Sequence, residues 1–407
     1  MREHAESTKV RIVYDASAKA DEKSPSLNDC LDIGRPLQRR ILDILLRSRM
    51  KPILLAGDIK QAFLQIVIRE IERDAMRFLW LNDLQRREMV VYRMTRAMFG
   101  LGPSPFLLGG TLNVHLEKYV QQYPQCVEEL SEGTYVDYIN IGGDTVEETR
   151  ALKEQAKEIL EEGSFMLHKW HSNAMELESD IVDDGEATYA KETLGTKPSD
   201  TKLLGLGWNK KEDTLFVSLT RQNIELTKRT ILRTIAKLYD PLGIAPPYLL
   251  IAKVIFRDIC DRKLGWDVEL PKDLQNRWMR WLDSLPSILT FPRSIPRERL
   301  SITEINIHGF ADASILGCCS VIYVVIKQGE VTSQGLLVSK VRLAKRDLTI
   351  PRLELIACHM VCNLIHNTRI VLSHLPVTRV FMRGLIQLFA YSGLTDRATT
   401  NSLFQIV

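Results

Sequence analysis

The stretch KPILLAGDIKQAFLQI, residues 51–66, is an apolar run that places a carboxylate, Asp58, at its end. The stretch GTYVDYINIGGD, residues 133–144, repeats this arrangement with Asp137. Both patterns predict strands, and a charge at the end of a strand must be solvated, paired or bound to metal. Carboxylates on neighbouring strand ends can share divalent cations, which prefer oxygen ligands. The two stretches therefore predict one metal site. Tyr138 follows Asp137 where a further acid would be expected.

Each acid also has a purely structural interpretation. Asp58 would suit the cap of a following helix, and aspartate is common in hairpin turns, such as the one that Asp137 predicts. A helix is predicted between them, with Ser104 at its N-cap and Pro105 at its first position. Taken with this helix, the two acids favour metal binding over the structural interpretation. An acid-ended strand, a Ser-Pro helix and a Y-x-D hairpin in this order favour two-metal nucleotidyl transfer.

Composition bounds the class of protein. The chain has 407 residues and a net charge of +3, so it has room for two to four domains and its bulk charge does not indicate nucleic-acid binding. Residues 221–237 and 340–352 each hold five basic side chains and one acid. Such clusters can follow a phosphate backbone, and a solvated helix face or loop is the alternative.

Targeting and redox features favour an intracellular protein. The seven cysteines are scattered, and Cys358 and Cys362, one helical turn apart, are interpreted as free thiols rather than metal ligands. The polar start, MREHAESTKV, has no signal-peptide core. The apolar run PPYLLIAKVIF is short and contains Lys253, so no membrane span is predicted.

The remaining patterns predict an alternation of helices and strands. Thr145 and Glu148 form a predicted capping box, ELESDIVDDGEA at 176–187 reads as an acidic loop, and LPSILTFPRSIPRER reads as a linker. Predicted helices cover residues 37–49, 104–119, 145–162, 224–238, 246–261, 271–284 and a segment that begins at Pro351. Predicted strands cover residues 75–80 and 88–93, a hairpin at 202–217, and several segments within 303–338.

Ten short motifs resemble one family: VRIVYDASAK, SLNDCL, GDIKQAFLQI, RFLW, YRMTRAMFGLGPSPFLL, GTYVD, LHKWHSN, LLGLGW, KLYDPLGIAPP and LTIPRLEL. Together they are similar to the reverse transcriptase of Bel-Pao type long-terminal-repeat retrotransposons. The resemblance implies an α+β fold with a right-hand polymerase palm and fingers at 1–220 and a helical thumb or connection at 221–300. A partial ribonuclease H-like α/β domain is expected at 301–407.

The resemblance assigns roles to single residues of the polymerase part. Asp58 and Asp137 match metal ligands that would hold two magnesium ions. The remaining matches would bind substrate: Phe63 would exclude the nucleotide 2′-hydroxyl, Gly100 would lie near the incoming nucleotide, Lys9 and Arg11 would hold its triphosphate, and Lys169 would lie near the leaving group. A core Phe63 and an exposed turn at Lys169 are the alternatives. Expected partners are an RNA template, a DNA primer, their hybrid and deoxynucleoside triphosphates.

In the last domain, Asp312 in GFADAS and Glu354 in PRLEL match two ribonuclease H acids. Glu354 also suits the first turn of a helix electrostatically. Three departures from the family pattern predict an impaired or partial copy. Tyr138 replaces a carboxylate, Arg383 and Gly384 stand where a third ribonuclease H acid is expected, and little finger sequence precedes Lys9.

Three functional hypotheses follow. The first is a reverse transcriptase–ribonuclease H fragment whose polymerase activity is impaired by Tyr138. The second is a non-catalytic relic of the same polyprotein that still binds nucleic acid. The third is a chain too truncated to fold stably.

Overall fold

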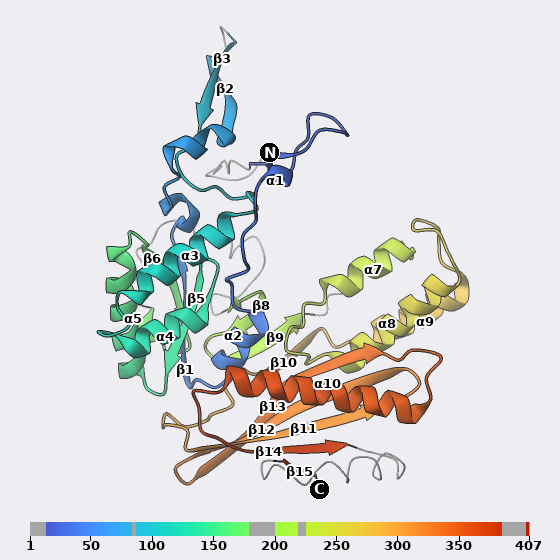
Figure 1. Ribbon diagram of the computed structural model, residues 1–407. Helices are drawn as coiled ribbons and strands as arrows, with labels where there is room; N and C mark the ends of the chain where they lie inside the picture. The colour runs from blue at the N-terminus through green and yellow to red at the C-terminus, as the bar shows by residue number, and fades with distance from the viewer. Residues whose placement is uncertain (1–13, 84–86, 179–199, 219–224, 385–403, 407) are drawn as a thin grey trace. The chain divides into compact units, whose positions relative to one another are not determined.

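The computed structural model describes residues 14–83, 87–178, 200–218, 225–384 and 404–406 (Figure 1). The chain divides into two compact units. The first comprises Met1–Arg39, Gly57–Ile139 and Lys153–Lys169, and the second comprises Arg40–Ala56, Asn140–Leu152 and Trp170–Val407. The fold is α+β, as predicted.

A four-stranded sheet with the order β4-β5-β1-β6 carries the predicted acids. Strand β1, Ile53–Ile59, is buried along almost its whole length, which explains its continuous apolar sequence. Its end from Gly57 onward belongs to the first unit. The other strands are β4, Thr134–Tyr135, β5, Tyr138–Gly143, and β6, Leu167–Ser172.

Helices α3, α4 and α5 are the longer helices that contribute to the first unit. Helix α3, Ser104–Glu117, begins at the predicted residue, but Pro103 is its N-cap and the Ser104 hydroxyl donates to the Met98 carbonyl at 2.6 Å. Helix α4 spans Pro124–Gly133, and α5, Val146–Glu162, runs through both units. At the start of α5 the Glu148 N–H donates to Thr145 Oγ1 at 3.2 Å, in line with the predicted cap.

A two-stranded ribbon of β2, Arg77–Asp83, and β3, Glu88–Arg93, projects from the rest of the first unit (Figure 1). Two 3₁₀ turns, η1 at Ala62–Gln65 and η2 at Glu70–Met76, precede it. Its large apolar side chains are exposed on both faces: Leu79, Trp80, Leu81, Met89, Val91 and Tyr92. The short helix α1, Leu27–Cys30, and the segment from Tyr14 contact the small core at the base of the ribbon.

The second unit contains helix α2, Ile41–Ser48, and an antiparallel sheet with the order β10-β9-β8-β7. Strand β10, Ile288–Pro292, pairs with β9 and lies inside the stretch predicted as a linker, so that prediction was wrong. The burial of the side chains alternates along β10, as in a strand, although the apolar residues of the sequence do not alternate and the nearby prolines are typical of a linker. The other strands are β7, Asp200–Leu203, β8, Leu206–Asn209, and β9, Thr214–Ser218.

Helices α7, α8 and α9 confirm three predicted helices. They span Lys228–Lys237, Pro246–Asp261 and Lys272–Ser284. The Trp278 and Trp281 rings of α9 lie 4.4 Å apart between centroids, and the Trp281 indole N–H donates to the Tyr248 carbonyl of α8. Aromatic burial thus fixes α9 on α8.

The last sheet has the order β13-β12-β11-β14-β15, with β11 and β14 parallel. Helix α10, Ile350–Val371, connects β13 to β14 and lies along the sheet (Figure 1). A methyl group at Gly309 would lie 2.6 Å from Ile365 of α10, so glycine permits this close approach. The strands are β11, Glu304–Ala313, β12, Gly317–Gln328, β13, Val331–Leu343, β14, Val377–Gly384, and β15, Phe404–Ile406.

Candidate acid site

The structure brings Asp58 and Asp137 together at the end of β1. The Ile59 N–H donates to the Asp137 carbonyl at 2.8 Å, which fixes the β4–β5 turn beside the strand end. Both carboxylates are partly buried. Burial raises the pKa of Asp58, the charge of Asp137 raises it further, and Lys169 opposes the shift. Burial also raises the pKa of Asp137. Two close carboxylates in this setting favour a bound cation.

Three residues around this pair have a left-handed backbone that is unusual for their type. Val136, immediately before Asp137, has φ 59°, Gln61 has φ 51°, and Lys169 has φ 55°. A β-branched residue such as Val136 rarely adopts this conformation, and such strain concentrates at functional sites. The two-residue turn imposes it, since Tyr135 pairs with Tyr138 across the hairpin. A two-residue hairpin turn requires a left-handed backbone at one of its residues, but the sequence alone did not predict which residues form the turn.

Tyr138 begins β5 and is partly buried. Burial raises its pKa, and the nearby charge of Asp58 raises it further. The phenol therefore lies within electrostatic range of Asp58 and stays neutral near pH 7. The position supplies no negative charge.

The predicted substrate-binding residues differ in their exposure to solvent, and two of them are not described by the structure. Phe63 is buried, and its ring meets that of Phe99 edge-to-face at 4.9 Å, so it contributes to the core. Gly100 has φ 89°, and a methyl group there would lie 2.6 Å from the Tyr14 carbonyl oxygen. Lys169 is exposed on β6, close enough to Asp58 to affect its pKa. Lys9 and Arg11 lie outside the described residues.

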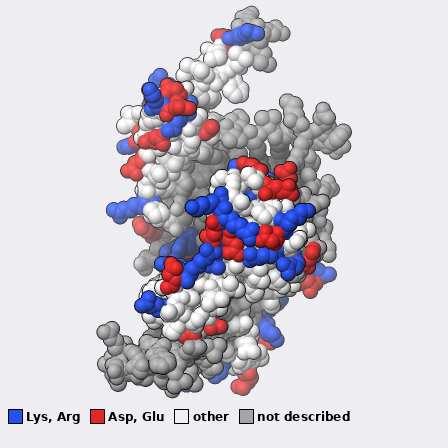
Figure 2. All heavy atoms as spheres, turned by 90° about the vertical axis from the view of Figure 1, so that its right-hand side faces the viewer, with Lys and Arg blue, Asp and Glu red and all other residues white. Residues whose placement is uncertain are grey.

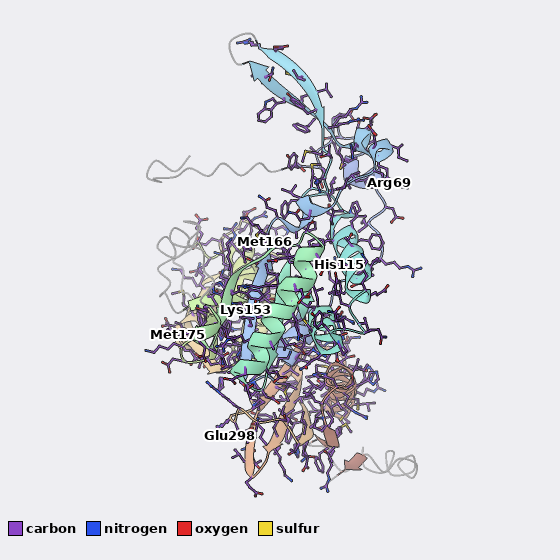
Figure 3. The ribbon with its side chains drawn as sticks, turned by 90° about the vertical axis from the view of Figure 1, so that its left-hand side faces the viewer. Arg69, His115, Lys153, Met166, Met175 and Glu298 are labelled. Atoms are coloured by element: carbon purple, nitrogen blue, oxygen red, sulfur yellow. The ribbon has the colours of Figure 1, made fainter. Side chains whose placement is uncertain are left out.

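Backbone contacts also position the segment that follows Asp58. The Lys60 N–H donates to the carbonyl of Met166 at 2.8 Å, which joins the end of β1 to the residue before β6 (Met166 is labelled in Figure 3). In the same unit, His115 of α3, which is labelled in Figure 3, is buried, and its Nε2 lies 2.5 Å from the Ile159 carbonyl of α5. The first contact joins the end of β1 to β6, and the second joins α3 to α5.

The donor set at this site is small. Within the described ranges, no group of three or more His, Cys, Asp or Glu side chains is placed to hold a metal ion. Asp58 and Asp137 are two oxygen-bearing ligands of the kind that Mg²⁺ prefers, with water completing its octahedral shell. The pair would supply two oxygen ligands to a divalent cation.

The structure does not bring Asp312 and Glu354 together. Side chains alternate along β11, and Ala311 is buried whereas Asp312 is exposed. Ala311 pairs with Ser320, whose hydroxyl donates to the Ala357 carbonyl of α10. Asp312 therefore lies on the sheet face opposite to α10. Glu354 on α10 is buried, and its Oε2 has no hydrogen-bond partner among the described residues.

The register of β14 places Arg383 beside Phe310 and Gly384 beside Ala311. These are the neighbours of Asp312 on the adjacent parallel strand, where a third acid was expected. Neither position carries a carboxylate.

The basic clusters are interleaved with acids. Arg229 makes a bidentate ion pair with Asp267 at 2.6 and 2.9 Å, and the Lys228 ammonium lies 4.7 Å from the Trp266 ring centroid. Arg346 pairs with Asp258 at 3.2 Å. Figure 2 shows blue and red side chains alternating over one face of the molecule. Carboxylates therefore offset part of the positive charge of Arg229 and Arg346.

Residues 227–382 match the Pao retrotransposon-like RNaseH-like domain. The match covers less than half of the chain and includes helices α7 to α9, strands β10 to β13, α10 and most of β14. It supports a Bel-Pao retrotransposon polyprotein fragment and does not reach the acid pair. No curated protein matches the chain. No described helix is long and apolar enough to span a bilayer.

Proposed function

We propose that this chain is a reverse transcriptase–ribonuclease H fragment of a retrotransposon polyprotein, with an impaired polymerase site. The polymerase part of this proposal is carried by the position of Asp58, in β1, beside Asp137, in the strained β4–β5 turn. The retrotransposon part is supported by the match over residues 227–382. The polymerase would occupy residues 1–220, and residues 221–300 would form its thumb or connection.

The proposed substrates are an RNA template with a DNA primer, and deoxynucleoside triphosphates. Asp58 and Asp137 would hold Mg²⁺, which in such sites activates the primer hydroxyl and stabilises the leaving pyrophosphate. Gly100 would let the backbone approach the nucleotide closely, since it carries no side chain. Lys169 would add positive charge near the phosphates.

Primer extension on an RNA template with Mg²⁺ tests this proposal. The expected result is little or no product from the wild type and restored synthesis by Tyr138→Asp, which returns a carboxylate to the hairpin. The double variant Asp58→Asn/Tyr138→Asp is the matched control and should again be inactive. Efficient synthesis by the wild type would refute the impairment, and an inactive but folded Tyr138→Asp protein would count against the polymerase assignment.

The second candidate is a non-catalytic nucleic-acid-binding relic, and the neutral Tyr138 is the observation that favours it. Binding of an RNA–DNA hybrid that weakens as salt rises, with no extension by any variant, would support this function. The ion pairs that Arg229 and Arg346 make with acids predict a shallow dependence of the binding constant on salt concentration.

A further inference from the structure

Helix α10 and strand β14 bring three sulfur-containing side chains together in the second unit. The thiol of Cys362, on α10, donates to the Sδ atom of Met382, on β14, at 3.4 Å. Cys358 precedes Cys362 by one helical turn. The Cβ atoms of helical residues four apart lie about 5–6 Å from each other, so the two thiols are neighbours on one side of α10.

The sheet explains why Met382 faces these thiols. A methyl group added to Gly309 of β11 would lie 2.6 Å from Ile365 and 2.8 Å from Val361, so Gly309 lies directly under α10. Met382 is the register partner of Gly309 on the parallel strand β14. Paired residues of neighbouring strands point to the same face of a sheet, so the thioether points toward α10. The contact with Cys362 therefore follows from the strand register.

The two thiols are better placed to bind a metal ion than to react. Burial raises the pKa of Cys358, and the Cys362 thiol raises it further. Burial also raises the pKa of Cys362, so both thiols stay protonated near pH 7 and are weak nucleophiles. A disulfide requires Cβ atoms about 3.5–4.5 Å apart, which is less than the helical spacing.

A metal ion suits the wider spacing, because it lies between the sulfur atoms that it binds. Two sulfur atoms that each lie about 2.3 Å from one ion are at most about 4.6 Å apart. The 3.4 Å between Cys362 and Met382 is within this limit. Cys362 is exposed and Cys358 is partly buried, so an ion would enter from solvent at Cys362.

We propose that Cys358, Cys362 and Met382 bind a single Cu(I) ion. Thiolate and thioether sulfurs are the soft ligands that select Cu(I), whereas Zn²⁺ sites are built from thiolate, imidazole and carboxylate ligands. The third donor here is a thioether, so the set is not a group of three His, Cys, Asp or Glu side chains. The bound ion would join consecutive turns of α10 to β14. This site is separate from the proposed polymerase function.

The charge of the site distinguishes Cu(I) from a divalent cation. Each thiol releases one proton when it binds, so Cu(I) with two thiolates and a neutral thioether carries one net negative charge. Glu354 lies one turn before Cys358, and its charge contributes to the raised pKa of that thiol. Glu354→Gln removes this like charge at nearly constant volume, so it should tighten Cu(I) binding by about threefold to tenfold.

Titration of the reduced full chain with Cu(I), without oxygen and against a chromophoric Cu(I) chelator, tests the site. The wild type should keep one Cu(I) per chain that the chelator does not remove. Cys358→Ser and Cys362→Ser should each weaken binding by about a hundredfold, and Met382→Leu by about tenfold. Cys319→Ser is the matched control and should leave binding unchanged. Cys319 precedes Ser320, whose hydroxyl donates to α10, so its side chain lies on the other face of the sheet.

Binding that Cys358→Ser and Cys362→Ser leave unchanged would overturn the proposal, since other thiols would then hold the ion. Weaker Cu(I) binding by Glu354→Gln would contradict an anionic copper–thiolate centre. X-ray absorption at the copper edge of the wild type decides the matter even where a variant does not fold. Sulfur alone around the ion is the expected result, and nitrogen or oxygen neighbours would refute the ligand set.

Discussion

Arg293 is fully enclosed and makes a bidentate ion pair with Asp213, with both N···O distances 2.6 Å. Its guanidinium also donates to the carbonyls of Ser48, Lys51 and Pro52 at 2.6, 2.8 and 3.0 Å. These bonds join β10 and the β8–β9 hairpin to the loop that leads into β1. The buried charge is stable because each nitrogen of the guanidinium donates to an oxygen acceptor.

Arg293→Met should therefore lower the free energy of unfolding by about 3–5 kcal/mol, because it removes the cation that pairs with Asp213 and the guanidinium donors to the Ser48 and Lys51 carbonyls. Chemical denaturation measures this loss. Arg293→Lys keeps the charge but not the two-pronged geometry, so its loss should be intermediate. Arg262→Met is the matched control, since it removes an exposed pair with Asp273 and should change stability little. A fully stable Arg293→Met protein would contradict the network.

Gly100→Ala should be destabilising by about 1–3 kcal/mol, since alanine pays for a left-handed φ and its methyl group would crowd the Tyr14 carbonyl. Gly110→Ala is the control: this glycine lies inside α3, and its added methyl group would lie 3.8 Å from the nearest atom. That change should raise stability by up to about 1 kcal/mol. Equal effects of the two substitutions on the thermal midpoint would contradict the assigned backbone geometry.

Acid should destabilise the second unit through His374. Its Nδ1 lies 3.1 Å from the Arg47 guanidinium, and partial desolvation of the ring, with the charges of Arg47 and Lys51, lowers the pKa of His374 from 6.5 to about 4. The unfolded chain therefore takes up this proton first, and stability falls as the pH drops from 6.5 toward 4. Chemical denaturation measured between pH 4 and 6.5 should show that the free energy of unfolding depends less steeply on pH in His374→Gln than in the wild type. Arg47→Gln should have an intermediate slope. An unchanged slope in His374→Gln would exclude this source of acid sensitivity.

Glu354→Met should raise stability by about 1–3 kcal/mol in the absence of divalent cations, because it removes a buried oxygen that has no described partner. Thermal unfolding in a chelator would measure the gain.

The Glu354→Met protein should leave the RNA strand of an RNA–DNA hybrid intact, as should the wild type, since Asp312 lies on the opposite sheet face. Rapid hydrolysis by the wild type, lost in Glu354→Met, would show that the two acids do meet.

The sequence predicted much of the local structure because its signals were local. The apolar run before Asp58, the Thr145 cap and the three helices between 224 and 284 all appear within a few residues of their predicted bounds. Strand β10 was missed because its three neighbouring prolines read as a linker, whereas the partner that makes it a strand, β9, lies about seventy residues earlier.

The site was predictable only in part. Spacing and motif predicted that Asp58 and Asp137 would lie close, and the structure places them so. The separation of Asp312 from Glu354 depends on the pairing of Ala311 with Ser320, and the role of Arg293 depends on segments more than 200 residues apart. Contacts of this kind leave no periodic trace in a sequence.

The division of the chain has a practical consequence for anyone who wishes to isolate its parts. The backbone passes between the units after Arg39, Ala56, Ile139, Leu152 and Lys169. No single cut releases either unit whole: a gene truncated at residue 220 would keep Ser48, Lys51 and Pro52 but discard Arg293, which caps their carbonyls. The contributions of the two units are therefore better distinguished by point substitutions in the full chain than by truncation.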